Sequence, residues 1–175
     1  MSARVRLFAM AALLLGACRA RTAPPLTVPT SARAVSDTLR GIVERVGNEP
    51  QSMLVARSAA GKTCVLHFTS PAPALEGLEV ALWGPGIDIQ PASSPAYSCT
   101  YEVRQFAVRA VDGIAAVDGV LRAEGASYAL ELASGERRAL REVPDALRTH
   151  VGARIFWAGS LDRAPAAYGV LSAAK

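Results

Sequence analysis

Hydrophobic and polar residues alternate in short runs along most of the chain, and a period of two residues is the pattern of β-strands. In the run CVLHF, for example, Cys64, Leu66 and Phe68 fall on one face of an extended strand and His67 falls on the other. Glycine, proline and asparagine separate these runs, as in the segment at residues 47–50. The pattern predicts an all-β protein.

We expect ten strands in two groups of five. The first group is predicted at Leu39–Val46, Ser52–Arg57, Thr63–Phe68, Glu79–Trp83 and Tyr101–Ala110. The second group is predicted at Ala116–Ala123, Ser127–Ala133, Arg137–Arg141, Ala153–Ala158 and Tyr168–Leu171. Between the third and fourth strands of the second group, a proline near the start of residues 143–152 and a glycine at their end predict a helix of one or two turns. Residues 73–77 occupy the same place in the first group with a shorter segment.

The two groups also match in the spacing of particular residues. Gly61 precedes Trp83 by 22 residues, and Gly135 precedes Trp157 by the same 22. Such matches over about forty residues predict a duplicated fold unit, at residues 37–111 and 112–175. The hinge, at residues 111–115, is too short for the units to move independently, so we expect them to pack together.

Five strands with a short helix between the third and the fourth resemble the OB-fold, a five-stranded small barrel. The resemblance implies two tandem OB-like barrels of the kind found in small periplasmic proteins and lipoproteins, and the second unit resembles the fold more clearly. No functional motif of a named OB family is present. A six-stranded or SH3-like small barrel is the alternative. An OB-like barrel binds extended polymers across strands two and three, where Tyr128 is the one obvious stacking group.

The first seventeen residues have the three parts of a signal peptide. Arg4 and Arg6 supply positive charge, an apolar run of ten residues follows at 7–16, and small residues lead to Cys18. Ten apolar residues cannot span a bilayer core of ~30 Å, which needs about twenty. We therefore set residues 1–17 apart from the fold.

The end of this leader, Leu15-Gly16-Ala17-Cys18, resembles the lipobox of bacterial lipoproteins. The resemblance implies that Cys18 carries diacylglycerol through a thioether and becomes the new N-terminus, so that the membrane is a partner. Arg19, in the place where aspartate favours inner-membrane retention, implies the outer membrane and its periplasmic face. The other location is the outer face of the cytoplasmic membrane. Residues 18–36, which are rich in proline and threonine, predict a flexible tether.

The formal net charge of +4 belongs to this leader and tether. Residues 1–36 contain five arginines and no acid, whereas the rest of the chain has 14 basic residues against 15 acids. The basic residues of the folded part alternate with acids, whereas a nucleic-acid-binding domain concentrates them on one face. We therefore expect no nucleic-acid partner.

Lipidation of Cys18 leaves two cysteines, Cys64 and Cys99. In an oxidising compartment an even remainder favours a disulfide. Cys64 opens the predicted third strand and Cys99 precedes the fifth, and these strands are parallel neighbours in an OB-like barrel. A zinc site is the alternative, but His67 and His150 lie far apart in sequence and no CxxC motif is present.

Catalytic chemistry finds no support in residue spacing. The chain has no GxSxG elbow and no phosphate-binding loop, and its acids are scattered. We interpret His67 and His150 as surface residues, and we assign no catalytic residue, metal or cofactor. The best binding candidates are three aromatic residues: Trp83, Tyr128 and Trp157.

These observations favour a non-enzymatic envelope lipoprotein whose paired barrels bind a protein or a glycan, or serve an assembly. The alternative is a hydrolase that acts on cell-wall material. A cleft that gathers His67 or His150 with a carboxylate would favour the hydrolase, and a surface with aromatic patches would favour binding.

The lipobox makes a direct prediction. Substitution Cys18→Ser removes the thiol that accepts diacylglycerol, so the precursor should stay unlipidated and the folded part should be released or mislocalised. Incorporation of labelled palmitate should fall to background, and undiminished labelling of the variant would refute the assignment.

Overall fold

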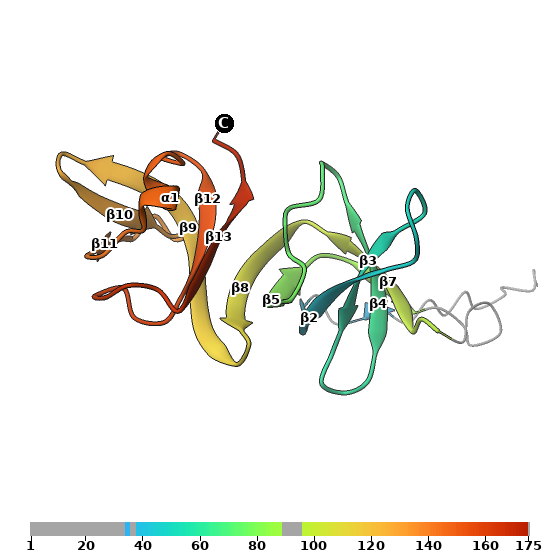
Figure 1. The fold of residues 1–175 in the computed structure, drawn as a ribbon. Coiled ribbons are helices and arrows are strands. Elements are labelled where there is room, and N and C mark those ends of the chain that lie inside the picture. Colours follow the sequence, from blue (N-terminus) through green and yellow to red (C-terminus); the bar gives the residue numbers. More distant parts are fainter. Residues whose placement is uncertain (1–33, 36–37, 89–95, 175) are drawn as a thin grey trace, which may run out of the picture. The chain divides into compact units, whose positions relative to one another are not determined.

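β-strands make up most of the residues that the computed structural model describes, which are 34–35, 38–88 and 96–174 (Figure 1). The predicted all-β class is confirmed. The predicted signal peptide, Cys18 and most of the predicted tether lie outside the described residues.

The first predicted unit contains strands at nearly all the expected places. These are β2 (Thr38–Val46), β3 (Met53–Arg57), β4 (Thr63–Phe68), β5 (Leu78–Trp83), β7 (Cys99–Val103) and β8 (Gln105–Val111). Two short strands, β1 (Ala34–Val35) and β6 (Gly86–Asp88), add to the prediction and pair with each other. The strand expected at residues 101–110 is two strands, because the chain changes its partner at Arg104. Strand β7 runs parallel to β4, whereas β8 runs antiparallel to β5.

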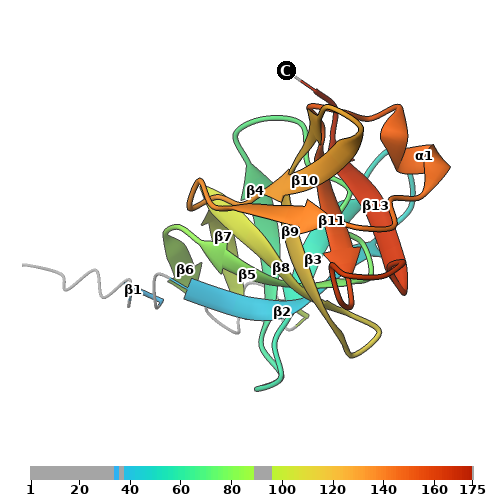
Figure 2. The same ribbon diagram turned by 90° about the vertical axis from the view of Figure 1, so that its left-hand side faces the viewer.

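The second predicted unit contains β9 (Ile114–Glu124), β10 (Ser127–Glu131), β11 (Arg137–Leu140), α1 (Asp145–Arg148), β12 (Arg154–Ala158) and β13 (Ala167–Ser172). Figure 2 shows β10 and β11 running beside β9. Helix α1 follows Pro144 and lies inside the segment predicted to be helical. Residues 73–77 of the first unit, in contrast, form turns and bends rather than a helix.

The same order of strand pairing occurs in both units. In each, the first strand pairs with the second and the fourth, and the second pairs with the third. The first strand also has a glycine at its crossing with the second strand. A Cβ at Gly41 would lie 2.5 Å from the Arg57 carbonyl oxygen, and one at Gly119 would lie 2.4 Å from the Glu131 carbonyl oxygen. Only glycine permits so close a backbone approach.

Two tandem OB barrels are not confirmed, because the hydrogen-bonded sheet is not closed. In the first unit β4 pairs with β7, as the third and fifth strands of an OB-fold do. Among the described strands, the corresponding β11 pairs with β10 alone, and its end is joined to the loop before β13 by one bond, from the Arg141 N–H to the Leu161 carbonyl at 3.2 Å. The chain enters β13 through a shorter path and forms no counterpart of β7.

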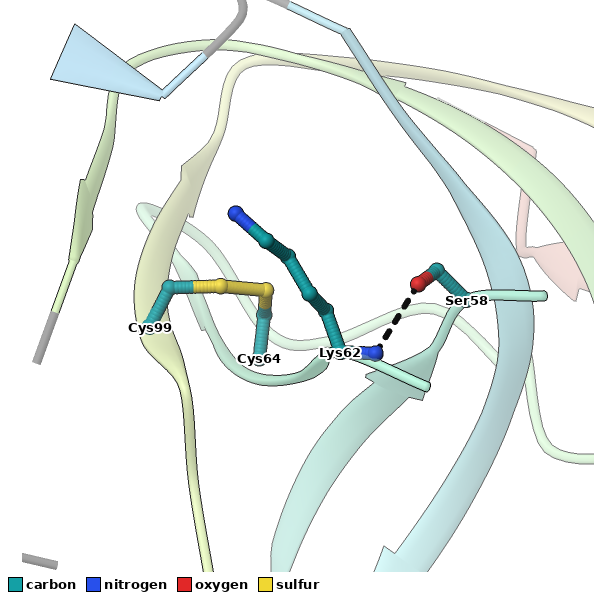
Figure 3. Close-up of a disulfide and its surroundings, with 4 residues drawn as sticks. All are labelled: Ser58, Lys62, Cys64 and Cys99. Atoms are coloured by element: carbon teal, nitrogen blue, oxygen red, sulfur yellow. Dashed lines mark hydrogen bonds between the residues drawn. A yellow bond between two sulfur atoms is a disulfide. The ribbon is translucent and has the colours of Figure 1, made fainter. Parts of the chain in front are cut away.

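The predicted disulfide between Cys64 and Cys99 is confirmed, with the two Cα atoms 4.5 Å apart. The two cysteines are direct partners in the parallel pair of β4 and β7, as expected from the strand order. Figure 3 shows the bridge close to a turn in which the Lys62 backbone N–H donates to Ser58 Oγ at 3.2 Å. Both cysteines are fully buried. The bridge therefore joins β4 to β7 inside the core of the first unit.

Strand β12 is buried on both faces. Ile155 and Trp157 point into the core of the second unit, whereas Phe156 and Ala158 pack against the core of the first. The described residues accordingly belong to one compact unit, in which the β12 side chains join two hydrophobic clusters.

Removal of the disulfide should destabilise the fold. The bridge closes a loop with a sequence separation of 35 residues, for which the loss of unfolded-chain entropy is worth about 4 kcal/mol. We expect urea unfolding to show that the double variant Cys64→Ala/Cys99→Ala has a free energy of unfolding lower by this amount. The reduced wild type should unfold at about the same urea concentration as the variant. A variant as stable as the oxidised wild type would contradict the expectation.

Candidate functional site

A groove of about 840 Å³ lies beside β8, where β8 and β9 diverge. Five parts of the chain line it: Trp83 at the end of β5, residues 104–109, residues 117–120 of β9, residues 131–135 of the β10–β11 hairpin, and Arg154 of β12. Its volume falls within the range of ~300–1,000 Å³ that small-molecule sites occupy. Of the two described cavities, this groove brings together more charged and aromatic side chains.

An ion pair closes the floor of the groove. The hydrogen-bonded ladder between β8 and β9 stops after two residue pairs. Beyond that point the side chains of Asp118 and Arg154 form the hydrogen bonds to the β8 backbone. One oxygen of Asp118 accepts the Val108 N–H at 2.7 Å, and the other accepts Arg154 Nε at 2.7 Å. Arg154 Nη2 donates to the Phe106 carbonyl at 2.7 Å. The side chain of Asp118 is 5% exposed. Both of its oxygens accept hydrogen bonds, and its charge is balanced by that of Arg154.

Two arginine side chains lie over aromatic rings at this groove. The Arg154 guanidinium lies 3.8 Å from the centre of the Phe106 ring, and that of Arg109 lies 5.7 Å from the centre of the Trp83 ring. Arg109 is the extra residue of a β-bulge, because β8 residues 108 and 110 pair with consecutive residues of β5. A bulge redirects the side chain that it carries, and here that side chain reaches the indole.

The second acid of the groove is also neutralised. Glu131 accepts hydrogen bonds from Arg122 at 3.1 Å and pairs with Arg137 at 3.0 Å. The hydrogen bond from Arg122 lowers the pKa of Glu131 below its ordinary value, Arg137 contributes in the same direction, and desolvation opposes the shift. Glu131 is therefore an ionised, fully paired carboxylate at neutral pH.

Two arginines at the groove remain available to a ligand. Arg104 Nε lies 3.6 Å from Glu102 Oε1, and the two side chains are 66% and 48% exposed. An ion pair this exposed is weak. Arg109 has no acid within ion-pair range among the residues that the structure describes. The groove thus offers positive charge beside an indole.

The three aromatic candidates from the sequence have different places. Trp83 is half-buried and lines the groove. Trp157 is fully buried, and its indole N–H donates to the Ser160 carbonyl at 3.0 Å. Tyr128 packs against the core of the second unit and lines neither of the two described cavities. The structure places only the first of them at a candidate binding surface.

The equal spacing of the two tryptophans does not give them equal positions. Counted from the residue that pairs with the first-strand glycine, Trp157 is two positions along its strand and Trp83 is three. Successive strand residues face opposite sides, so Leu82, which is fully buried, is the counterpart of Trp157. The predicted match of Trp83 with Trp157 is therefore wrong by one residue, and this shift turns Trp83 outward.

Both histidines are exposed, and neither lines a described cavity. His67 stands beside Glu102 in the parallel pair of β4 and β7, outside the groove. Within the described ranges no group of three or more His, Cys, Asp or Glu side chains could hold a metal ion. A second cavity, of about 600 Å³, is lined mainly by apolar residues and glycines, with Arg45, Glu76 and Asp112 among its residues.

Sequence reasoning missed Arg109, Asp118 and Arg154 as site residues. Two of them carried a readable signal, because Asp118 and Arg154 are opposite charges in strand runs that are mostly apolar. A buried acid needs a partner, and the same unit offers that arginine. The bulge that places Arg109 has no local sequence signal.

No protein-family model, curated protein or solved structure matches this chain significantly. In the part of the chain that the structure describes, no helix has the length and apolar character to cross a membrane.

The ion pair on the floor predicts a large mutational effect. Asp118→Ala should destabilise the protein by about 3 kcal/mol, because it leaves the Val108 N–H and the Arg154 guanidinium without their acceptor. Asp162→Ala is a matched control, since Asp162 is 83% exposed and 3.8 Å from Arg141. It should change the free energy of unfolding by at most ~0.5 kcal/mol. Similar losses in the two variants in urea unfolding would refute a structural role for the pair.

Proposed function

We propose that this chain is an exported lipoprotein, held at the membrane by a lipid on Cys18, whose folded part is a non-catalytic binding module. The module faces the periplasm from the outer membrane and takes an envelope protein or glycan as its ligand. The disulfide between Cys64 and Cys99 supports this location, because such bonds persist in oxidising compartments.

The observation that carries the binding function is the groove beside β8. Its two acids are each paired with arginine, while Arg109, which lies over the Trp83 indole, has no acidic partner among the described residues. Paired acids are poor general bases, and no imidazole lines the groove. An indole beside an available cation is a recognition surface.

Site-specific photo-crosslinking in the envelope tests this function. A photoreactive amino acid should give a discrete crosslinked product when it replaces Gln105, which is exposed and lines the groove. Trp83→Ala should abolish that product, because the indole is the largest apolar contact in the groove.

The control is the same photoreactive amino acid at Gln51, an exposed glutamine in the turn before β3 and outside the groove. Products that form equally from both positions, or that persist in the Trp83→Ala variant, would reject the groove as the binding site.

A further inference from the structure

We propose that the groove binds an acidic saccharide, with its anionic group on Arg109 and Arg104 and the apolar face of a sugar ring against Trp83. This inference rests on the proposed binding function and names its ligand. Three observations support it: the charge of the lining residues, the position of the Arg109 side chain, and the hydrogen bonds that the edge of β8 already makes.

The charge argument follows from the pairing of the lining residues. Asp118 is neutralised by Arg154, and Glu131 is neutralised by Arg122 and Arg137 from outside the lining. Neither acid repels an incoming anion, whereas Arg109 and Arg104 attract one. A guanidinium donates two parallel hydrogen bonds to a carboxylate, sulfate or phosphate, which gives the contact direction as well as charge.

The position of Arg109 is built into the strand. Its bulge on β8 lies opposite Glu79 and Val80 of β5. Between the bulge and Trp83, Ala81 of β5 pairs directly with Ala107 of β8. Because these side chains are small, the arginine and the indole meet across the sheet surface. The guanidinium is therefore held above an aromatic face and beside the groove.

The edge of β8 argues for a saccharide over an extended peptide. Extended peptides add to an exposed sheet edge through backbone hydrogen bonds. At this edge the Val108 N–H and the Phe106 carbonyl already bond to Asp118 and Arg154. The groups that remain, Gln105 and Ser134 with the hairpin backbone, suit separate hydroxyl groups such as those on a sugar ring.

The two tryptophans make the site observable. The structure places Trp83 at the groove and Trp157 fully inside the core, so a ligand that enters the groove should change the emission of Trp83 alone. Trp83→Phe should remove this optical response, and calorimetry measures the affinity independently of it.

The test uses the full-length protein in detergent, with a hexamer of galacturonic acid as the probe and its methyl ester as the neutral twin. We expect saturable binding of the acid, and binding of the ester weaker by at least about tenfold, since charge-assisted hydrogen bonds are lost. Arg109→Gln should weaken binding of the acid by a similar factor and reduce its dependence on salt. Arg163→Gln, which removes an exposed arginine outside the groove, should change it less than about twofold.

Three results would overturn the inference. One is equal binding of the acid and its ester, which would remove the role of charge. Another is equal loss in the Arg109 and Arg163 variants, which would place the contact outside the groove. The third is binding of hexaglutamate but not of the hexagalacturonate, which would make the ligand an acidic peptide. In each case the photo-crosslink at Gln105 still reports whether the groove binds an envelope component, so the two proposals fail separately.

Discussion

The ion pair between Asp118 and Arg154 is the interaction on which the arrangement of the folded part depends. Strand β8 leaves its partner β9 after a short hairpin, and the next backbone groups of β8, at Val108 and Phe106, then have no partner among the described strands on that side. Such groups need hydrogen-bond partners, and one carboxylate with one guanidinium supplies them at 2.7 Å each. Because Asp118 belongs to β9 and Arg154 to β12, the pair fixes both strands against β8. The groove exists because the strands diverge above this neutral floor.

The two units differ in whether their third strand gains a second partner. In the first unit it does, and the disulfide lies at that pairing. Both have the same order of pairing and a glycine at the same crossing. In the first unit a long segment returns to form β7, and the disulfide joins it to β4. In the second unit the chain goes directly into β13, and buried side chains such as Leu147 and Trp157 fill the core beside the unpaired edge. The second unit thus relies on packing where the first relies on a covalent bond.

The sequence predicted the parts of this structure that local patterns control. A period of two residues located the strands, a proline and a glycine bounded the segment that contains α1, and cysteine parity together with strand order located the disulfide. It could not predict the break at Arg104, because there the chain changes partner between β4 and β5, which are distant in sequence. For the same reason it matched Trp83 with Trp157 as equivalent positions of the two units: residue spacing does not reveal an offset of one residue, and such an offset reverses the face of the strand.

The groove is a product of these long-range features, which explains why no motif in the sequence indicates it. The register shift turns Trp83 out of the core, the bulge brings Arg109 to it, and the divergence of β8 from β9 opens space beside both. The bulge and the early end of the β8–β9 ladder both give up strand pairing at that point. Asp118 and Arg154 supply hydrogen bonds to β8 from the floor of the groove, so the irregular strand is tied to β9 and β12. A binding site on a rigid support loses little conformational entropy when a ligand enters, and this favours recognition of a ligand with few contacts of its own, such as a short, charged saccharide.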